Sequence, residues 1–85
     1  MAYFSQANVP FTFQQIKEMD ARLSPDGKLV DGMRLRIVYE GEDGTTVITG
    51  IWGTIEQAES FFKRLSEITC GPSPKLYPIH EWIQA

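Results

Sequence analysis

One histidine gives this chain its clearest capacity for chemistry near neutral pH. His80 is the only histidine, and imidazole is the side chain whose ordinary pKa lies closest to neutrality. It can act as a general base or hydrogen-bond a ligand carbonyl. No second acid or base stands at a fixed spacing beside it, so a structural histidine on a strand is the competing interpretation. His80 is therefore the candidate catalytic residue.

Aromatic and amide side chains supply candidates for binding a small ligand. Trp52 closes a β-branched run and Phe62 belongs to the apolar stripe of the segment that follows, so both can line an aromatic pocket. The alternative for each is packing in the core or at a dimer interface. Asn8 can orient a ligand, or it can cap a strand end beside Pro10. We treat Asn8, Trp52 and Phe62 as candidate ligand-binding residues.

Two arginines stand two residues apart in an alternating segment. In an extended strand Arg34 and Arg36 share a face, and guanidinium groups bind carboxylates through paired hydrogen bonds. They can clamp a ligand that carries a carboxylate. The alternative is pairing with Glu40, with Glu81 or with an acid of another chain. Arg36 completes the candidate ligand-binding set.

Two amphipathic helices are expected to position these residues. Each begins with a threonine followed three residues later by glutamine, which is the spacing of a capping box. Apolar residues then recur at the period of a helix, and the Gly–Pro pair at 71–72 ends the second one. The expected helices are Phe13–Leu23 after the Thr12/Gln15 box, and the segment up to Thr69 after the Thr54/Gln57 box.

Four strands are predicted from alternating or β-branched runs that glycine and proline interrupt. The loop Gly41–Gly44 is so short that the strands on either side of it must pair antiparallel. Pro78 lacks the N–H that a ladder needs and favours an edge position or a bulge for the last strand. The expected strands are Ala2–Val9, Met33–Glu40, Thr45–Trp52 and Lys75–Gln84.

The resulting order, β-α-β-β-α-β, predicts one ferredoxin-like α+β domain over residues 1–85, with a four-stranded antiparallel sheet and two helices on one face. The other face must be polar or be buried by a partner. We expect Val38 and apolar residues of the third and fourth strands to lie there. A second copy would cover them in a dimeric α+β barrel, and the modest core of an 85-residue chain also favours a homodimer.

The block from Val47 to Phe62 resembles a known superfamily. Its strand, Val47–Trp52, and its helix start, Thr54–Phe62, are similar to the signature of the dimeric α+β barrel superfamily, which includes the antibiotic biosynthesis monooxygenase-like proteins. The resemblance implies a face-to-face dimer and either cofactor-independent chemistry or no activity. In the haem-degrading branch a histidine late in the second helix ligates haem. That helix has no histidine here, which disfavours haem degradation.

Composition and motifs narrow the function classes further. The formal charge is −3, from 8 basic and 11 acidic residues, so nucleic acid and membrane surfaces are not expected partners. The third strand also lacks the stacking aromatics of RNA-recognition domains. No apolar run approaches the roughly 20 residues of a membrane span. No metal-ligand spacing or phosphate loop occurs, so we expect no metal and no cofactor.

The single cysteine, Cys70, excludes an intramolecular disulfide and suits a reducing compartment, so a cytoplasmic location is expected. Its place at the end of a helix disfavours a role as nucleophile, because helix N-termini, not C-termini, stabilise thiolates.

Two functions of different classes stay open. In the first, a small homodimeric barrel binds or transforms a small, mostly apolar metabolite without metal, as a monooxygenase-like protein would. Asn8, Arg36, Trp52 and Phe62 would then line the pocket, and His80 would transfer protons. In the second, the dimer is a non-catalytic ligand-binding or accessory module. A pocket too small for a ligand, or filled by Phe62 and Trp52, would favour the second.

Overall fold

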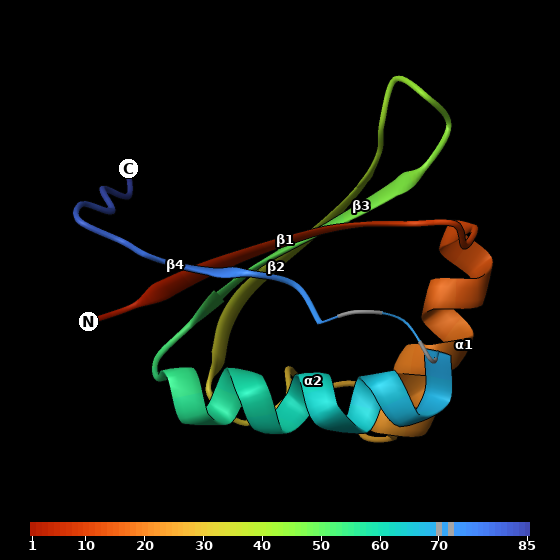
Figure 1. Ribbon diagram of the computed structural model, residues 1–85, viewed down its shortest axis with the longest axis horizontal. Helices are drawn as coiled ribbons and strands as arrows, with labels where there is room; N and C mark the ends of the chain where they lie inside the picture. The colour runs from red at the N-terminus through yellow and green to blue at the C-terminus, as the bar shows by residue number, and fades with distance from the viewer. Residues whose placement is uncertain (70, 72) are drawn as a thin grey trace.

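The computed structural model describes residues 1–69, 71 and 73–85. These residues form a ferredoxin-like α+β fold with the expected order β-α-β-β-α-β (Figure 1). The elements in chain order are β1 (Tyr3–Val9), α1 (Phe13–Leu23), β2 (Met33–Glu40), β3 (Thr46–Trp52), α2 (Ile55–Thr69) and β4 (Leu76–Pro78).

The four described strands form one antiparallel sheet in the order β2-β3-β1-β4. β3 lies inside the sheet, between β2 and β1, so its side chains have neighbours on both sides. Figure 1 shows β4, near the end of the chain, beside β1 at its beginning. The β2–β3 hairpin extends beyond the rest of the sheet.

The hairpin loop between β2 and β3 is held by its own hydrogen bonds. The Gly41 N–H donates to the Thr45 carbonyl at 2.7 Å. Asp43 Oδ1 accepts from the hydroxyl of Thr45 at 2.6 Å and from its N–H at 3.1 Å. These two bonds, the hydroxyl first, hold the pKa of Asp43 below its usual value. They therefore support the loop at neutral pH and are lost as the pH falls through that pKa.

Both helices begin at the predicted capping residues. Thr12 Oγ1 accepts from the Gln15 N–H at 3.2 Å, and Gln15 Oε1 accepts from the Thr12 N–H at 2.8 Å, which completes the box of α1. At α2 the Thr54 hydroxyl accepts from the Gln57 N–H at 3.2 Å and donates to Gln57 Oε1 at 3.1 Å. Local sequence is enough to set these helix starts.

A β-bulge near the start of β2 breaks its two-residue alternation. Met33 lies opposite Trp52 and Leu35 lies opposite Ile51, so two steps along β2 match one step along β3. Arg34 is the extra residue. Beyond Arg34, each side chain of β2 therefore lies on the face opposite to the one it would occupy in a regular strand that starts at Met33.

The bulge explains why the expected location of Val38 is wrong. Arg36 lies opposite Gly50 and Val38 opposite Ile48, and both of these β3 residues share a face with Trp52. Trp52 packs against α2. Val38 therefore lies on the face that the helices cover, whereas Leu35, Ile37 and Tyr39 lie on the uncovered face.

β4 is much shorter than the strand predicted over Lys75–Gln84. Leu76–Pro78 pair with Ser5–Tyr3, and the Ile79 N–H adds one bond to the Ala2 carbonyl at 2.9 Å. Residues 80–85 form no strand and extend away from the sheet (Figure 1). The strand length predicted from β-propensity was too great, because β4 needs β1 as its partner and the hydrogen-bond ladder stops where β1 begins. β4 is an edge strand, the position that Pro78 favours.

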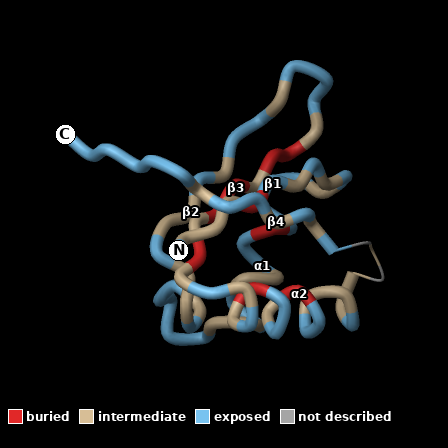
Figure 2. The backbone as a smooth tube through the Cα atoms, turned by 60° about the vertical axis from the view of Figure 1, so that its left-hand side comes forward, coloured by how far each residue is buried: buried red, intermediate tan, exposed pale blue. Residues whose placement is uncertain are grey.

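The core is built around the end of β3. Trp52 and Ala58 are fully buried and Phe62 is 5% exposed. The Trp52 ring centroid lies 5.5 Å from those of Phe61 and Phe62, and its Nε1–H donates to Ser5 Oγ at 3.0 Å. Figure 2 shows buried residues along β3 and on α2.

Gly32 lies where the loop before β2 meets the start of α2. Its φ is +86°, and a Cβ built on it would lie 2.5 Å from Cβ of Gln57. We expect Gly32→Ala to lower the free energy of unfolding by about 2–3 kcal/mol, because left-handed backbone strain adds to the steric clash. Denaturant unfolding followed by circular dichroism measures this loss.

Gly27→Ala is the matched control. Gly27 also has a positive φ, +74°, but a Cβ built on it meets no atom within 4 Å. We expect a loss of only about 1 kcal/mol, from backbone strain alone. Equal losses in the two variants would contradict tight packing between Gly32 and Gln57.

Candidate functional site

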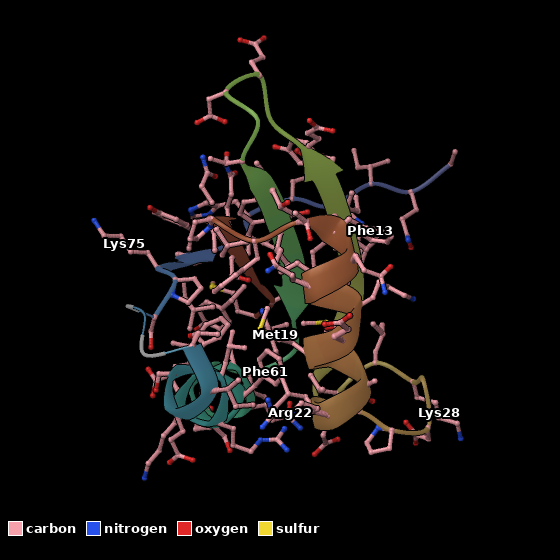
Figure 3. All side chains as sticks on the ribbon, turned by 90° about the vertical axis from the view of Figure 1, so that its right-hand side faces the viewer. Phe13, Met19, Arg22, Lys28, Phe61 and Lys75 are labelled. Carbon is pink, nitrogen blue, oxygen red and sulfur yellow. The ribbon has the colours of Figure 1, made fainter. Side chains whose placement is uncertain are left out.

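A small cavity lies between the helix-covered face of the sheet and the two helices. Its volume is about 70 Å³, and most of its lining is apolar. Met19 from α1 and Phe61 from α2 both point into this region (Figure 3). The volume is about half that of an engineered apolar cavity of about 150 Å³ that binds benzene. The cavity therefore accommodates only a few carbon atoms.

An open cleft of about 320 Å³ adjoins this cavity. It lies beside the end of α1, the loop 24–32 and the start of β2, with Lys17 and Lys28 in its lining. The volume falls at the lower end of small-molecule pockets, about 300–1,000 Å³. Residues that line both the cleft and the cavity are Asp20, Leu23, Met33, Arg36 and Phe61.

Arg36 and Asp20 form an ion pair where the cleft meets the cavity. Arg36 Nη1 donates to Asp20 Oδ2 at 2.5 Å, and the two side chains are 23% and 32% exposed. The expected partners, Glu40 or Glu81, are therefore wrong, because β2 presents Arg36 to α1. Arg34 lines neither space, and its guanidinium lies close to Gly53.

Trp52 and Phe62 line the cavity from the core. The bond from Trp52 Nε1 to Ser5 Oγ fixes the indole ring and also satisfies the hydroxyl of a cavity-lining serine. Thr49 also lines the cavity, but its side chain lies on the opposite face of the sheet, where its hydroxyl donates to the Ile37 carbonyl at 3.1 Å. The hydroxyl beside Trp52 is thus already engaged.

Asn8 lies on the uncovered face of the sheet. It is exposed and stands opposite Val47, whereas its neighbours Ala7 and Val9 line the cavity. Strand alternation directs neighbouring side chains to opposite faces. Asn8 therefore does not join Arg36 and Trp52.

His80 lies beyond the end of β4. It is exposed and lines neither the cleft nor the cavity. Of the five candidate residues, the structure brings Arg36, Trp52 and Phe62 together and leaves Asn8 and His80 elsewhere.

Asp20 is the site residue that sequence reasoning missed. It stands four residues after buried Ile16 and three before Leu23, so it belongs to the inner edge of α1. A carboxylate at that spacing on an apolar stripe needs a cation from another element. This was the available signal, although the sequence does not indicate that the cation is Arg36.

The uncovered side of the sheet is a second candidate surface, which we call the open face. Ile37, Tyr39 and Tyr77 are 52%, 48% and 53% exposed on it. None of its side chains is charged. The residues of the open face are Phe4, Gln6, Asn8, Leu35, Ile37, Tyr39, Val47, Thr49, Ile51 and Tyr77.

The described residues offer neither a metal centre nor a membrane-spanning helix. No group of three or more His, Cys, Asp or Glu side chains there is placed to hold a metal ion. Within the same ranges, no helix combines the length and apolarity needed to cross a bilayer. The expectation about Cys70 lies outside the described residues.

Comparison with known proteins adds no relative. No family model matches the sequence, and neither curated proteins nor solved structures give a significant match. Membership of the dimeric α+β barrel superfamily therefore stays a prediction.

Proposed function

We propose that this protein is a homodimeric α+β barrel that holds a small, mostly apolar ligand without transforming it. The observation that carries the proposal is the cleft joined to an apolar cavity beneath α1 and α2. Clefts with apolar walls and a few convergent polar groups are the usual sites of small ligands. The single cysteine favours a cytoplasmic location.

The open face supports the homodimer. Half-exposed Ile37, Tyr39 and Tyr77 make an uncharged apolar surface of the kind that proteins bury against partners. A two-fold dimer brings one surface against its own copy, and a face without charge then brings no like charges together. The helices would lie outside such a barrel and leave both clefts accessible.

Binding is favoured over catalysis by the polar groups around the cavity. Proton transfer needs a titratable group within hydrogen-bond reach of the ligand. Asp20 is paired with Arg36, and His80 lies outside the cavity. A metal-free, monooxygenase-like reaction is the alternative, and loss of turnover in His80→Ala would support it.

Filling the cavity tests the proposal. Ala7 lines the cavity, so Ala7→Leu should occupy the space that a ligand needs. We expect 1-hexanol to shift the NMR signals of Met33 and of the Trp52 indole N–H in the parent protein. In Ala7→Leu the affinity should fall by about tenfold or more, since roughly two buried methylenes are displaced.

Asn8→Leu is the control. It introduces the same leucine one residue later in β1, where the side chain lies on the open face and not in the cavity. Hexanol affinity should stay at the parent value in this variant. Absence of hexanol binding to the parent, or equal affinity in Ala7→Leu, would contradict a ligand site in the cavity.

A further inference from the structure

The cleft is positively charged although the chain is acidic. Lys17, Lys28 and Arg36 line it together with one acidic residue, Asp20, whereas the whole chain carries a net charge of −3. Asp26, also on the loop, is outside this lining, and its Oδ1 accepts from Ser24 Oγ and the Lys28 N–H. The surplus of cations is therefore a local property of the cleft.

Arg36 keeps donors that Asp20 does not use. A guanidinium has five N–H groups. Within the described residues, Arg36 donates one side-chain hydrogen bond, from Nη1 to Asp20 Oδ2. The side chain is 23% exposed at the junction of the cleft and the cavity. A carboxylate reaching this junction can accept two parallel bonds from such a group.

Apolar residues line the same junction of cleft and cavity as Arg36. Leu23, Met33 and Phe61 line both the cleft and the cavity, as Arg36 does. A ligand held by its carboxylate on Arg36 therefore has apolar contacts from the cleft inward. The inner volume of about 70 Å³ limits it to a short chain or a small branched group.

We propose that the ligand is a short amphipathic monocarboxylate, with its carboxylate on Arg36 and its apolar part in the cavity. This rests on the proposed function, because it assigns the chemistry of the ligand at the same site. Lys17 and Lys28 contribute attraction at the mouth, and Asp20 holds the Arg36 side chain in place.

A comparison of three probes tests this assignment. Hexanoate, 1-hexanol and hexylamine share their chain and differ in their charge. By isothermal titration calorimetry, hexanoate should bind the parent about tenfold to a hundredfold more tightly than 1-hexanol, because hydrogen bonds between charged groups are the stronger ones. Hexylamine should bind more weakly than 1-hexanol.

Two variants remove the cations separately. Arg36→Gln should lower the affinity for hexanoate by about tenfold or more and leave that for 1-hexanol unchanged. Should this variant fail to fold because Asp20 loses its partner, Lys28→Gln in the exposed loop provides the second test. It should weaken hexanoate binding by about threefold.

Arg34→Gln is the control, because it removes an exposed arginine of β2 that lines neither the cleft nor the cavity. It should leave hexanoate affinity unchanged. If hexanoate binds no more tightly than 1-hexanol, or if Arg34→Gln weakens it as much as Arg36→Gln does, the monocarboxylate assignment is wrong. If 1-hexanol still binds the parent and loses affinity in Ala7→Leu, the proposed function stands without the monocarboxylate assignment. If none of the three probes binds the parent, both the proposed function and the assignment are wrong.

Discussion

Trp52→Ala should lower the free energy of unfolding by about 3–5 kcal/mol, because it empties the largest fully buried position of the fold. The ring packs against Phe61 and Phe62 and is completely inaccessible to solvent. The substitution also leaves Ser5 Oγ without its donor. Circular dichroism during urea unfolding measures the loss without depending on tryptophan fluorescence.

Trp82→Ala is the matched control, because it removes the other tryptophan from the irregular segment after β4. Trp82 is 38% exposed, and we expect its replacement to cost less than about 1 kcal/mol. Trp52→Phe should fall between the two alanine variants, since it keeps an aromatic ring but not the N–H. Equal losses for Trp52→Ala and Trp82→Ala would contradict a core centred on Trp52.

Ile37→Lys should prevent the proposed homodimer from forming. Ile37 is 52% exposed on the open face, so a lysine there is solvated in the single chain. In a dimer closed through the open faces it would bury one unpaired ammonium from each copy, at about 3 kcal/mol or more per charge. We expect the dissociation constant of the dimer to rise by at least about a hundredfold. Analytical ultracentrifugation measures this constant.

Leu29→Lys provides the comparison for this variant. Leu29 is 50% exposed, nearly as much as Ile37, but it lies on the loop before β2 and lines the cleft. The same substitution there should leave the dimer intact. A parent-like dissociation constant in Ile37→Lys would rule out the open face as the interface.

The helices were predictable because their signals are local. Thr12 and Thr54 cap α1 and α2 as expected, and the apolar stripe beginning at Ala58 identifies the buried side of α2. A capping hydrogen bond spans three residues, so the sequence alone contains both partners.

The faces of β2 were not predictable in the same way. The alternation from Met33 to Tyr39 looks regular, and the bulge at Arg34 becomes visible only from the pairing with β3. The true end of β4 likewise depends on where β1 can pair with it, although apolar residues continue through Trp82 and Ile83. Register is a property of two strands, and one strand's pattern does not contain it.

The candidate site residues show the same difference between signals that are local and signals that depend on a second element. Trp52 and Phe62 were found because a strand end and a helical stripe place them locally. Asp20 was missed because its partner Arg36 stands 16 residues away on another element. His80 was placed on a strand that ends before reaching it.

Sedimentation equilibrium of the parent protein at micromolar concentration tests the proposed homodimer most directly. We expect a species of twice the 9.7 kDa mass of one chain, because the uncharged open face exposes Ile37, Tyr39 and Tyr77 unless a second copy covers it. A stable monomer throughout that range would contradict the dimeric barrel.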